Sequence, residues 1–564
     1  MNRSSSQQPR PRWRQALALC GKTAGVVGVL LIAGWSIPGC LTLERVNPDT
    51  ITVERYPWLQ APEEVPVGDV FEVTASLEVE PPGMEVANQE LQLPDQSQWQ
   101  LTVILEAPDC EIVGGEAVRT VNMERDKPSE PAVFQLQAIP GEDGWADGKE
   151  LPIAASFWYE NRLLVRVSET MKVGAALKPA ELPQEEAEPA AMFWEREEAD
   201  LQIVVSDRSL ILSAPVFGPP IYIETEPLSA EDRQSLEQLY AELEAVAASR
   251  NLGPRPEERQ AAEDGRARAT AVRIGRVLWQ RLAPPAFQDA FWDLADGLGN
   301  DFDSLQIYAD DPSIPWELMR PSREGLDGLE ERDFLGLEFD IARGHAPRRR
   351  GRFVRMPGEV PLDALWVLRP DYRPPLLGTA AEVQSLQAFQ PVSAKIRPST
   401  YDELVQITQE LPNGILHFAG HGVESRDDAT GTTYSILLSD QPVTLNEWLG
   451  LLPAPRLRNH PFIFFNACSV GKTHQSLGFA EGWAPAFLEA GASGYVGTLW
   501  PVGDQAAARF AGRFYEALET DLEDGGGSPA RAIREARRLF TEDPNPTYLA
   551  YVLYGETDLL LTRR

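Results

Sequence analysis

The sequence predicts a multidomain protein with an N-terminal β-sandwich and a C-terminal α/β domain built on a mostly parallel sheet. The chain has 564 residues, more than a single hydrophobic core usually supports. Apolar and polar residues alternate with period two from Val70, and the pattern recurs up to about residue 175. Beyond about residue 300, apolar strands alternate with amphipathic helices, which is typical of parallel sheets.

Composition narrows the classes of partner and cofactor. Apolar residues make up 43% of the chain and charged residues 24%, which are ordinary values for a soluble protein. The formal net charge is −34, and such a surface repels phosphate backbones, so we expect no nucleic-acid partner. The four cysteines are scattered and form no C-x-x-C pair. We therefore expect no disulfide framework, no metal site and no cofactor.

Residues 1–40 have the pattern of a signal or anchor segment. Five basic side chains and no acidic one occur there, and the apolar run GVVGVLLIAGWSIPGC ends at Cys40. Positive charge before an apolar run keeps the chain start in the cytoplasm and sends the following residues across the membrane. Residues 37–40 resemble a bacterial lipoprotein cleavage box, which makes Cys40 a candidate lipidation site. A single transmembrane anchor helix and a buried core helix stay open as alternatives.

Both membrane interpretations predict a membrane-anchored protein with the bulk of the chain outside the cytoplasm. The next part, residues 60–175, is predicted to be a β-sandwich of immunoglobulin type, because short strands are separated by turn residues. Its strands are expected at 70–78, 99–105 and 132–138, with a hairpin over 153–167. Residues 176–200 are rich in Pro, Ala and Glu and are predicted to be an acidic linker.

Residues 201–300 are predicted to be an α/β extension of the C-terminal domain. Three short apolar strands precede a helix that begins after Ser229, with Asp232 three residues further on as in a capping box. A second amphipathic helix, at 272–282, ends before two consecutive prolines. We find no catalytic constellation in this part.

Residues 301–564 contain the two strands on which chemistry is expected. The run ILHFAGHG at 415–422 ends in His-Gly, and IFFNACSVG at 463–471 contains Cys468 after its apolar part. In an open parallel sheet, ligands gather at the carboxyl ends of the strands. If the two strands are neighbours, His421 and Cys468 face each other across one cleft. A base beside a thiol is the minimum requirement for an activated cysteine nucleophile.

These strands are part of a longer series of motifs. IPWEL, HFAGHG, SILLSD, FFNACSVG and GTLWPVGDQAAARF follow one another between about residues 300 and 555. In this order they resemble the CHAT domain, a family of the caspase–separase group of cysteine peptidases. The resemblance implies a caspase-like fold for 301–564, with His421 as the catalytic histidine and Cys468 as the nucleophile. The β region and residues 201–300 resemble accessory modules that accompany such domains in bacterial conflict and signalling systems.

The resemblance and the residue types together predict a cysteine-type endopeptidase that cleaves a protein or peptide partner. His421 takes the thiol proton, and the thiolate of Cys468 attacks a peptide carbonyl. Backbone N–H groups of Gly422 and Cys468 are expected to stabilise the oxyanion. Asp440 and Asp504 are candidate residues of a substrate pocket for a basic side chain, as acids serve in some relatives. The accessory domains are expected to regulate the peptidase or to recognise its partner.

Residues of the two strands and of the loop after them also allow other interpretations. His417 could serve as the base instead, but it lies inside the apolar run and is interpreted as structural. Asn466 could orient a group near the site, but a strand-end asparagine more often satisfies a turn, which is the interpretation preferred here. Gly471-Lys472-Thr473 ends like a phosphate-binding loop, but that motif requires glycine at position 466, so we expect no nucleotide-driven switch. The alternative function is a non-enzymatic scaffold, in which the caspase-like domain binds protein partners through its cleft. A regulatory protein is a further expected partner of the peptidase.

Overall fold

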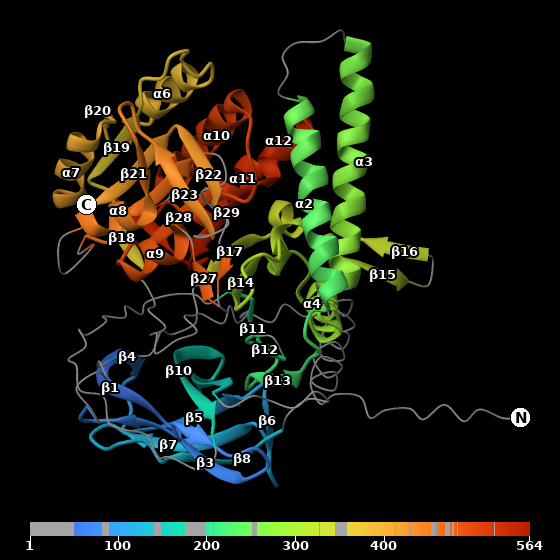
Figure 1. Ribbon diagram of the computed structural model, residues 1–564, viewed down its shortest axis with the longest axis vertical. Helices are drawn as coiled ribbons and strands as arrows, with labels where there is room; N and C mark the ends of the chain where they lie inside the picture. Colours follow the sequence, from blue (N-terminus) through green and yellow to red (C-terminus); the bar gives the residue numbers. More distant parts are fainter. Residues whose placement is uncertain are drawn as a thin grey trace, which may run out of the picture.

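The computed structural model of the chain consists of a strand-rich part, a pair of long helices and a large α/β part (Figure 1). It describes residues 50–81, 89–139, 148–174, 199–206, 208–250, 257–325, 328–344, 358–411, 413–427, 431–452, 457, 459–467, 474–476, 479–481, 483–523 and 525–563. The predicted anchor, residues 1–40, and almost all of the predicted linker lie outside these residues. Within them, no helix is long and apolar enough to cross a membrane.

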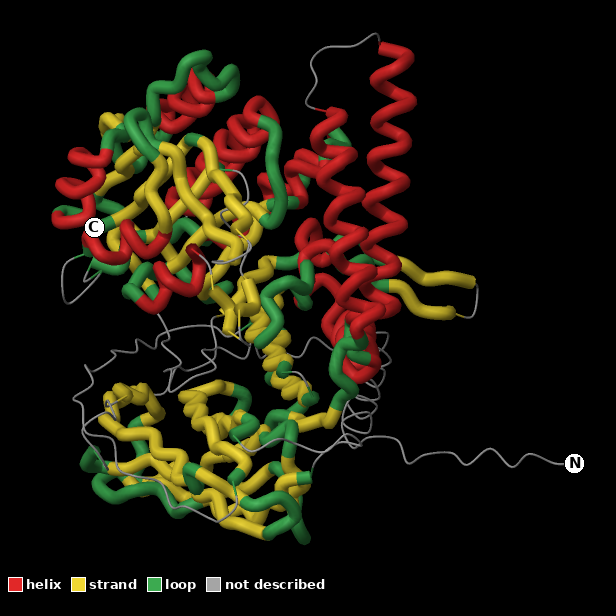
Figure 2. The backbone as a smooth tube through the Cα atoms, in the orientation of Figure 1, coloured by secondary structure: helices red, strands yellow, loops and turns green. Residues whose placement is uncertain are grey.

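The strand-rich part is a sandwich of two five-stranded sheets, ordered β4-β1-β3-β8-β6 and β2-β10-β9-β5-β7. Figure 2 shows these strands gathered in the lower part of the molecule. The strands are β1 (Thr50–Gln60), β2 (Glu64–Val65), β3 (Val70–Glu78), β4 (Gln89–Pro94), β5 (Gln98–Glu106), β6 (Cys110–Ile112), β7 (Val118–Glu124), β8 (Ala132–Ala138), β9 (Glu150–Tyr159) and β10 (Arg162–Val173).

The alternation that predicted the sandwich is present in β3. Phe71, Val73, Ala75 and Leu77 are all buried, and they belong to one core cluster with residues of the second sheet. Successive side chains of a strand point to opposite faces, so this alternation turns one face of β3 toward the core. The strand-rich region is thereby confirmed, whereas its immunoglobulin type stays a prediction. Its first strand begins at Thr50, ahead of the expected start at residue 60.

The α/β part is organised on one sheet of eleven strands, ordered β13-β12-β11-β14-β17-β29-β28-β25-β21-β19-β20. We call it the main sheet. Its strands are β11 (Leu201–Val205), β12 (Ser209–Ser213), β13 (Ile221–Glu224), β14 (Ser304–Ala309), β17 (Asp340–Gly344), β19 (Ala364–Arg369), β20 (Ala394–Pro398), β21 (Gly414–Ala419), β25 (Phe462–Asn466), β28 (Gly494–Thr498) and β29 (Tyr551–Gly555).

The main sheet is mostly parallel, as predicted, but it contains two blocks of opposite direction. Strands β11, β14, β17 and β29 are parallel to one another, as are β28, β25, β21, β19 and β20. The blocks meet at the antiparallel pair β28–β29. Strands β11 and β14 therefore run in the opposite direction to β21 and β25, and the carboxyl ends of the two pairs lie on opposite sides of the sheet.

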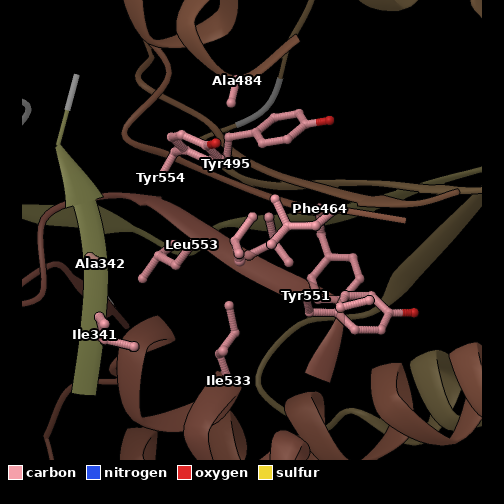
Figure 3. Packing of buried hydrophobic residues seen from close by; sticks show 14 of the residues in the cluster. Ile341, Ala342, Phe464, Ala484, Tyr495, Ile533, Tyr551, Leu553 and Tyr554 are labelled. Atoms are coloured by element: carbon pink, nitrogen blue, oxygen red, sulfur yellow. The ribbon is translucent and has the colours of Figure 1, made fainter. Parts of the chain in front are cut away.

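Helices cover both faces of the main sheet. Figure 3 shows Ala484 of α9 and Ile533 of α11 on opposite sides of the strands that carry Tyr495 and Leu553. The helices of this part are α5 (Leu335–Glu338), α6 (Thr379–Ala388), α7 (Tyr401–Gln409), α8 (Leu445–Leu451), α9 (Trp483–Glu489), α10 (Asp504–Glu523), α11 (Pro529–Arg537) and α12 (Leu539–Glu542). Because both faces are covered, the strands read as nearly continuous apolar runs.

Four small sheets accompany the main sheet. They are built from β15 (Ser322–Gly325) with β16 (Gly328–Glu331), β18 (Glu359–Pro361) with β30 (Leu560–Thr562), β26 (His474–Ser476) with β27 (Phe479–Glu481), and β22 (His421–Asp427) with β23 (Gly431–Leu437) and β24 (Pro442–Thr444). Strand β22 of the last sheet begins two residues after the end of β21, so this small sheet positions His421.

The long helices α2 (Ala230–Arg250) and α3 (Glu257–Leu282) stand side by side next to the α/β part (Figure 1). The predicted cap is confirmed: Oγ of Ser229 accepts the backbone N–H of Asp232 at 3.1 Å. Helix α4 (Pro285–Leu298) begins at the second of the two prolines that follow α3, with Pro284 as its N-cap residue. Strands β11 to β13 join the main sheet, so residues 201–300 are continuous with the α/β part.

The sandwich packs against the β11–β12–β14 end of the main sheet. One small core cluster is shared by both parts: Ile104, Trp158, Leu163, Val204, Ile211 and Tyr308. Beside it, Nε of Arg166 donates to Glu106 at 2.9 Å, and both side chains are buried. Burial acts to raise the pKa of Glu106, but Arg166 and neighbouring hydroxyl groups outweigh it and hold that pKa below its ordinary value.

Candidate functional site

The two strands that carry the predicted chemistry are neighbours. Strand β21 pairs in parallel with β25, and Ala419 lies opposite Asn466. Gly420 follows β21, and its N–H donates to the carbonyl oxygen of Asn466 at 3.3 Å. A Cβ at position 420 would lie 2.6 Å from the hydroxyl of Tyr372, so glycine permits a close approach that no other residue allows. The carboxyl ends of both strands therefore meet, which is the condition on which the sequence argument for a shared site depends.

His421 begins β22 at this edge and is held by Tyr372. Its backbone N–H donates to the hydroxyl oxygen of Tyr372 at 2.9 Å, and the two rings pack with centroids 4.7 Å apart. The same hydroxyl donates to the carbonyl oxygen of Leu437 in β23 at 2.6 Å. Tyr372 thus connects the start of β22 to the end of β23 and supports one side of the imidazole. His421 stays partly exposed.

Cys468, the predicted nucleophile, lies outside the described residues, as do Lys472 and Thr473 of the rejected phosphate loop. The structure follows β25 as far as Ala467, whose carbonyl oxygen accepts the hydroxyl of Thr498 at 2.8 Å. Gly422, the other predicted oxyanion residue, lies in β22 opposite Ile436. Its role stays a prediction.

The two acidic pocket candidates have different surroundings, and the charge of His421 is among the influences on the pKa of Asp504. Asp504 begins α10, and its carboxylate accepts the backbone N–H of Gly378. Burial raises the pKa of Asp504, and the charge of Glu382 adds to this effect. The N–H of Gly378 and the charge of His421 act in the opposite direction.

Asp440 instead supports a helix terminus. It is exposed, and both of its carboxylate oxygens lie 3.1 Å from the backbone nitrogen of Tyr401, the first residue of α7. At that helix start, the hydroxyl of Thr400 also accepts the N–H of Glu403 at 3.3 Å. A carboxylate beside a helix N-terminus is stabilising in its own right. The carboxylate of Asp440 therefore serves the start of α7.

A buried polar network lies beneath the two strand ends. Glu382 of α6 has an exposed fraction of 3%, and His417 of β21 is fully buried. Nε2 of His417 lies 2.9 Å from Oε1 of Glu382, and Nδ1 of His417 lies 3.0 Å from the hydroxyl of Tyr515 in α10. Both ring nitrogens of His417 thus have partners inside the core. These contacts agree with its interpretation as a structural residue.

Asn466 belongs to the same network, so its interpretation as a turn residue is wrong. Its side-chain nitrogen donates to Oε1 of Glu382 at 2.5 Å and to the carbonyl oxygen of Ala507 at 3.2 Å. Its side-chain oxygen accepts the hydroxyl of Tyr551 at 2.6 Å. The residue that ends β25 is therefore fixed to helices α6 and α10 and to strand β29. Cys468 follows two residues later in the chain.

Sequence reasoning missed Tyr372 and Glu382. Tyr372 lies in the proline-rich segment RPDYRPP, which has no periodic pattern from which its position could be inferred. Glu382 occupies the first turn of α6, where an acidic residue ordinarily indicates a solvated helix start.

The described residues contain no group of three or more His, Cys, Asp or Glu side chains arranged to hold a metal ion.

A family model described as the CHAT domain matches residues 272–555, about half of the chain. The chain has no match among curated proteins. Among solved structures, it is similar to the separase–securin complex of Saccharomyces cerevisiae, with 14% identity and a TM-score of 0.39. That match covers 63% of this chain and only 30% of the other chain.

Two further solved structures are similar at comparable levels. The first is the Arg-specific cysteine proteinase gingipain R, with 13% identity and a TM-score of 0.34, covering 66% of this chain and 80% of that one. The second is the complex of the pro- and mature domains of RgpB from Porphyromonas gingivalis, with 13% identity and a TM-score of 0.33. It covers 59% of this chain and 78% of that one.

Proposed function

Because this chain belongs to the CHAT-domain family, we propose that it has a caspase-like fold and is a cysteine endopeptidase with His421 and Cys468 as its catalytic dyad. The observation that supports the proposal is the register of β21 and β25, which sets Ala419 opposite Asn466. Two residues beyond Ala419 is His421, and two residues beyond Asn466 is Cys468. A base and a thiol follow neighbouring strands at the edge where parallel sheets gather their ligands.

The proposed reaction has two stages. His421 takes the proton of the Cys468 thiol, and the thiolate attacks the carbonyl carbon of the scissile peptide bond. The N–H groups of Gly422 and Cys468 stabilise the oxyanion, each contributing roughly 3 kcal/mol. Protonated His421 gives its proton to the leaving amine as the C–N bond breaks, which leaves a thioester. Water, activated by His421, then hydrolyses the thioester and restores the thiol.

For specificity, we propose that Asp504 lies in the pocket for the side chain before the cleaved bond, and that this side chain is basic. A carboxylate whose burial raises its pKa is stabilised by an incoming ammonium or guanidinium group, which offsets part of the desolvation. Asp440 is dropped from the pocket, because both of its oxygens serve the start of α7.

The setting of the peptidase is also a proposal. Residues 1–40 anchor the protein to the membrane, by lipidation of Cys40 or as a single helix, and the bulk of the chain is extracytoplasmic. The sandwich and the helical extension recognise a regulatory partner in a bacterial signalling or conflict system. The packing of the sandwich on the β11–β14 end of the main sheet supports this regulatory role, since that junction is remote from β21 in the strand order.

Covalent labelling tests the dyad. The full chain is treated with peptidyl electrophiles that differ only in the leading side chain, and the modified residue is identified by mass spectrometry. We expect modification of Cys468, strongest with arginine or lysine, and its loss in His421→Ala. Cys110 is an internal control, because burial raises the pKa of its thiol to about 12 and an unionised thiol does not react. Equal labelling of Cys468 in His421→Ala would contradict the dyad.

A further inference from the structure

A cavity of about 520 Å³ lies beside the β13 edge of the main sheet, where the order of the described strands ends. It is bounded by the ends of β11 and β14, the segment after β13, the start of α2 and the turn between α3 and α4. Its lining includes the apolar side chains of Leu228, Leu282, Ile314 and Trp316. The volume falls within the range of about 300–1,000 Å³ that ligand pockets occupy.

The cavity adjoins β13, which is the last strand at this edge. The N–H of Thr225 donates to the carbonyl oxygen of Arg208 at 2.9 Å, and Ile223 lies opposite Leu210. Because hydrogen-bonded and non-hydrogen-bonded pairs alternate in an antiparallel ladder, the backbone groups of Tyr222 and Glu224 point away from β12. An edge that presents such groups is a template for pairing with another strand.

The rim of the cavity is acidic. Glu224 and Glu226 are exposed along it. Two arginines also line the rim, but their charge is already balanced: Arg233 pairs with Asp311 at 2.9 Å, and Arg281 pairs with acidic side chains in the first turn of α2. The charge left at the edge is therefore negative, in a chain whose formal net charge is −34.

We propose that β13 and this cavity form a docking site for an extended, basic peptide segment of a partner protein. The peptide backbone pairs with the outward groups of Tyr222 and Glu224, and its lysine or arginine side chains face Glu224 and Glu226. One large apolar side chain enters the cavity. Backbone pairing supplies affinity, and the pocket for alternate side chains supplies specificity, as in other cases of strand addition.

This site is separate from the proposed catalytic cleft and adjoins the sandwich. Seven strands lie between β13 and β21 in the main sheet. Ser206 lines the cavity, and its hydroxyl donates to Glu106, the buried carboxylate of the sandwich that Arg166 also holds. A bound peptide therefore contacts the junction at which the sandwich is seated. The inference does not depend on His421 or Cys468.

A subtractive selection tests the proposal with a displayed library of random heptapeptides. The full chain with Cys468→Ala serves as the bait, so that no peptide is cleaved. The same chain carrying Glu224→Pro as well removes peptides that do not use the edge. Proline at 224 deletes an outward N–H and leaves the ladder to β12 intact, whereas Glu224→Gln changes the charge alone. Unchanged melting temperatures show that both variants fold.

We expect the selection to enrich peptides with alternating Lys or Arg residues and one large apolar residue. A synthetic copy should bind at least tenfold more weakly to Glu224→Pro, and by a smaller, salt-dependent factor to Glu224→Gln. Ala286→Phe, which adds a side chain at the cavity wall, should weaken binding without altering the salt dependence. The proposal is overturned if no peptide is enriched over the Glu224→Pro chain, if the enriched peptides bind that chain equally, or if His421→Ala abolishes their binding.

Discussion

Nε2 of His417 lies 2.9 Å from Oε1 of Glu382, and the two side chains are buried between β21 and α6. The same carboxylate oxygen accepts the side-chain N–H of Asn466. One acidic group thus connects the strand that leads to His421 with the strand that leads to Cys468. Buried polar groups are stabilising only when their hydrogen bonds are satisfied, so removing Glu382 should affect both strands together.

Glu382→Ala should lower the free energy of unfolding by about 3–5 kcal/mol, because it leaves buried donors of His417 and Asn466 without an acceptor. Glu382→Gln retains one carbonyl oxygen and should lower it less. Glu516→Ala on α10 is a matched control, since Glu516 is exposed and such changes stay within about 0.5 kcal/mol. Urea unfolding followed by circular dichroism measures all three. Equal stabilities of Glu382→Ala and Glu516→Ala would show that the network does not hold the strands.

Tyr372→Phe tests the hydrogen bond through which Tyr372 holds the backbone of His421. The change keeps the ring that packs on the imidazole but removes the hydroxyl that accepts the His421 N–H and donates to Leu437. The loss of these two hydrogen bonds, each worth roughly 0.5–1.5 kcal/mol, should let His421 shift from its position and lower kcat by about tenfold. KM should stay nearly constant, since no substrate contact is removed. Steady-state cleavage of a peptide substrate separates the two constants, and a change confined to KM would argue that Tyr372 contacts substrate instead.

The sequence predicts the site to the extent that local patterns specify it. Two apolar runs that end in His-Gly and in Asn-Ala-Cys are sufficient to expect two buried strands, and β21 and β25 are buried along their whole length. The cap of α2 at Ser229 was predictable for the same reason, because its partner Asp232 lies three residues away. Features of this kind depend on residues that are close in the chain.

Long-range relationships were not predictable. The contact of Asn466 with Glu382 joins residues 84 positions apart, and no local pattern of a strand-end asparagine distinguishes a turn from a buried network. The reversal between β28 and β29 was missed because both strands are buried along their whole length. A strand covered on both faces reads as a continuous apolar run in either direction.

Asp504→Asn should change specificity more than turnover. If Asp504 faces the basic side chain of the substrate, its neutralisation leaves a buried cation unpaired, at a cost of roughly 2–5 kcal/mol. We expect kcat/KM for an arginine substrate to fall by about 30-fold or more, and that for a leucine analogue to change little. Asp440→Asn is the matched control and should leave both values unchanged. If Asp440→Asn gave the larger loss, the assignment of the pocket would be reversed.

The pH dependence of this preference follows from the raised pKa of Asp504. Only the ionised carboxylate attracts a basic side chain, and a raised pKa means that protonation begins at a higher pH than the ordinary value of about 3.9. The arginine-to-leucine ratio of kcat/KM should therefore decline on acidification before the pH reaches that value. In Asp504→Asn the ratio should be independent of pH over the same range, because the titrating group is absent.

Asp340 provides a test of stability against pH that is independent of catalysis. Burial raises the pKa of Asp340 to about 6, although Arg534, 3.3 Å away, acts to lower it. The folded protein therefore binds the proton more tightly than the unfolded chain, whose carboxyl titrates near the ordinary value of about 3.9. The protonated carboxyl of Asp340 contributes its full stabilisation below the unfolded pKa of about 3.9, and this contribution is lost as the pH rises through about 6.

Asp340→Asn should consequently raise the free energy of unfolding at pH 7.5 and have little effect at pH 4. Urea unfolding at both pH values measures the difference, and a loss of stability at pH 7.5 would show that the ion pair with Arg534 outweighs the burial of the charge.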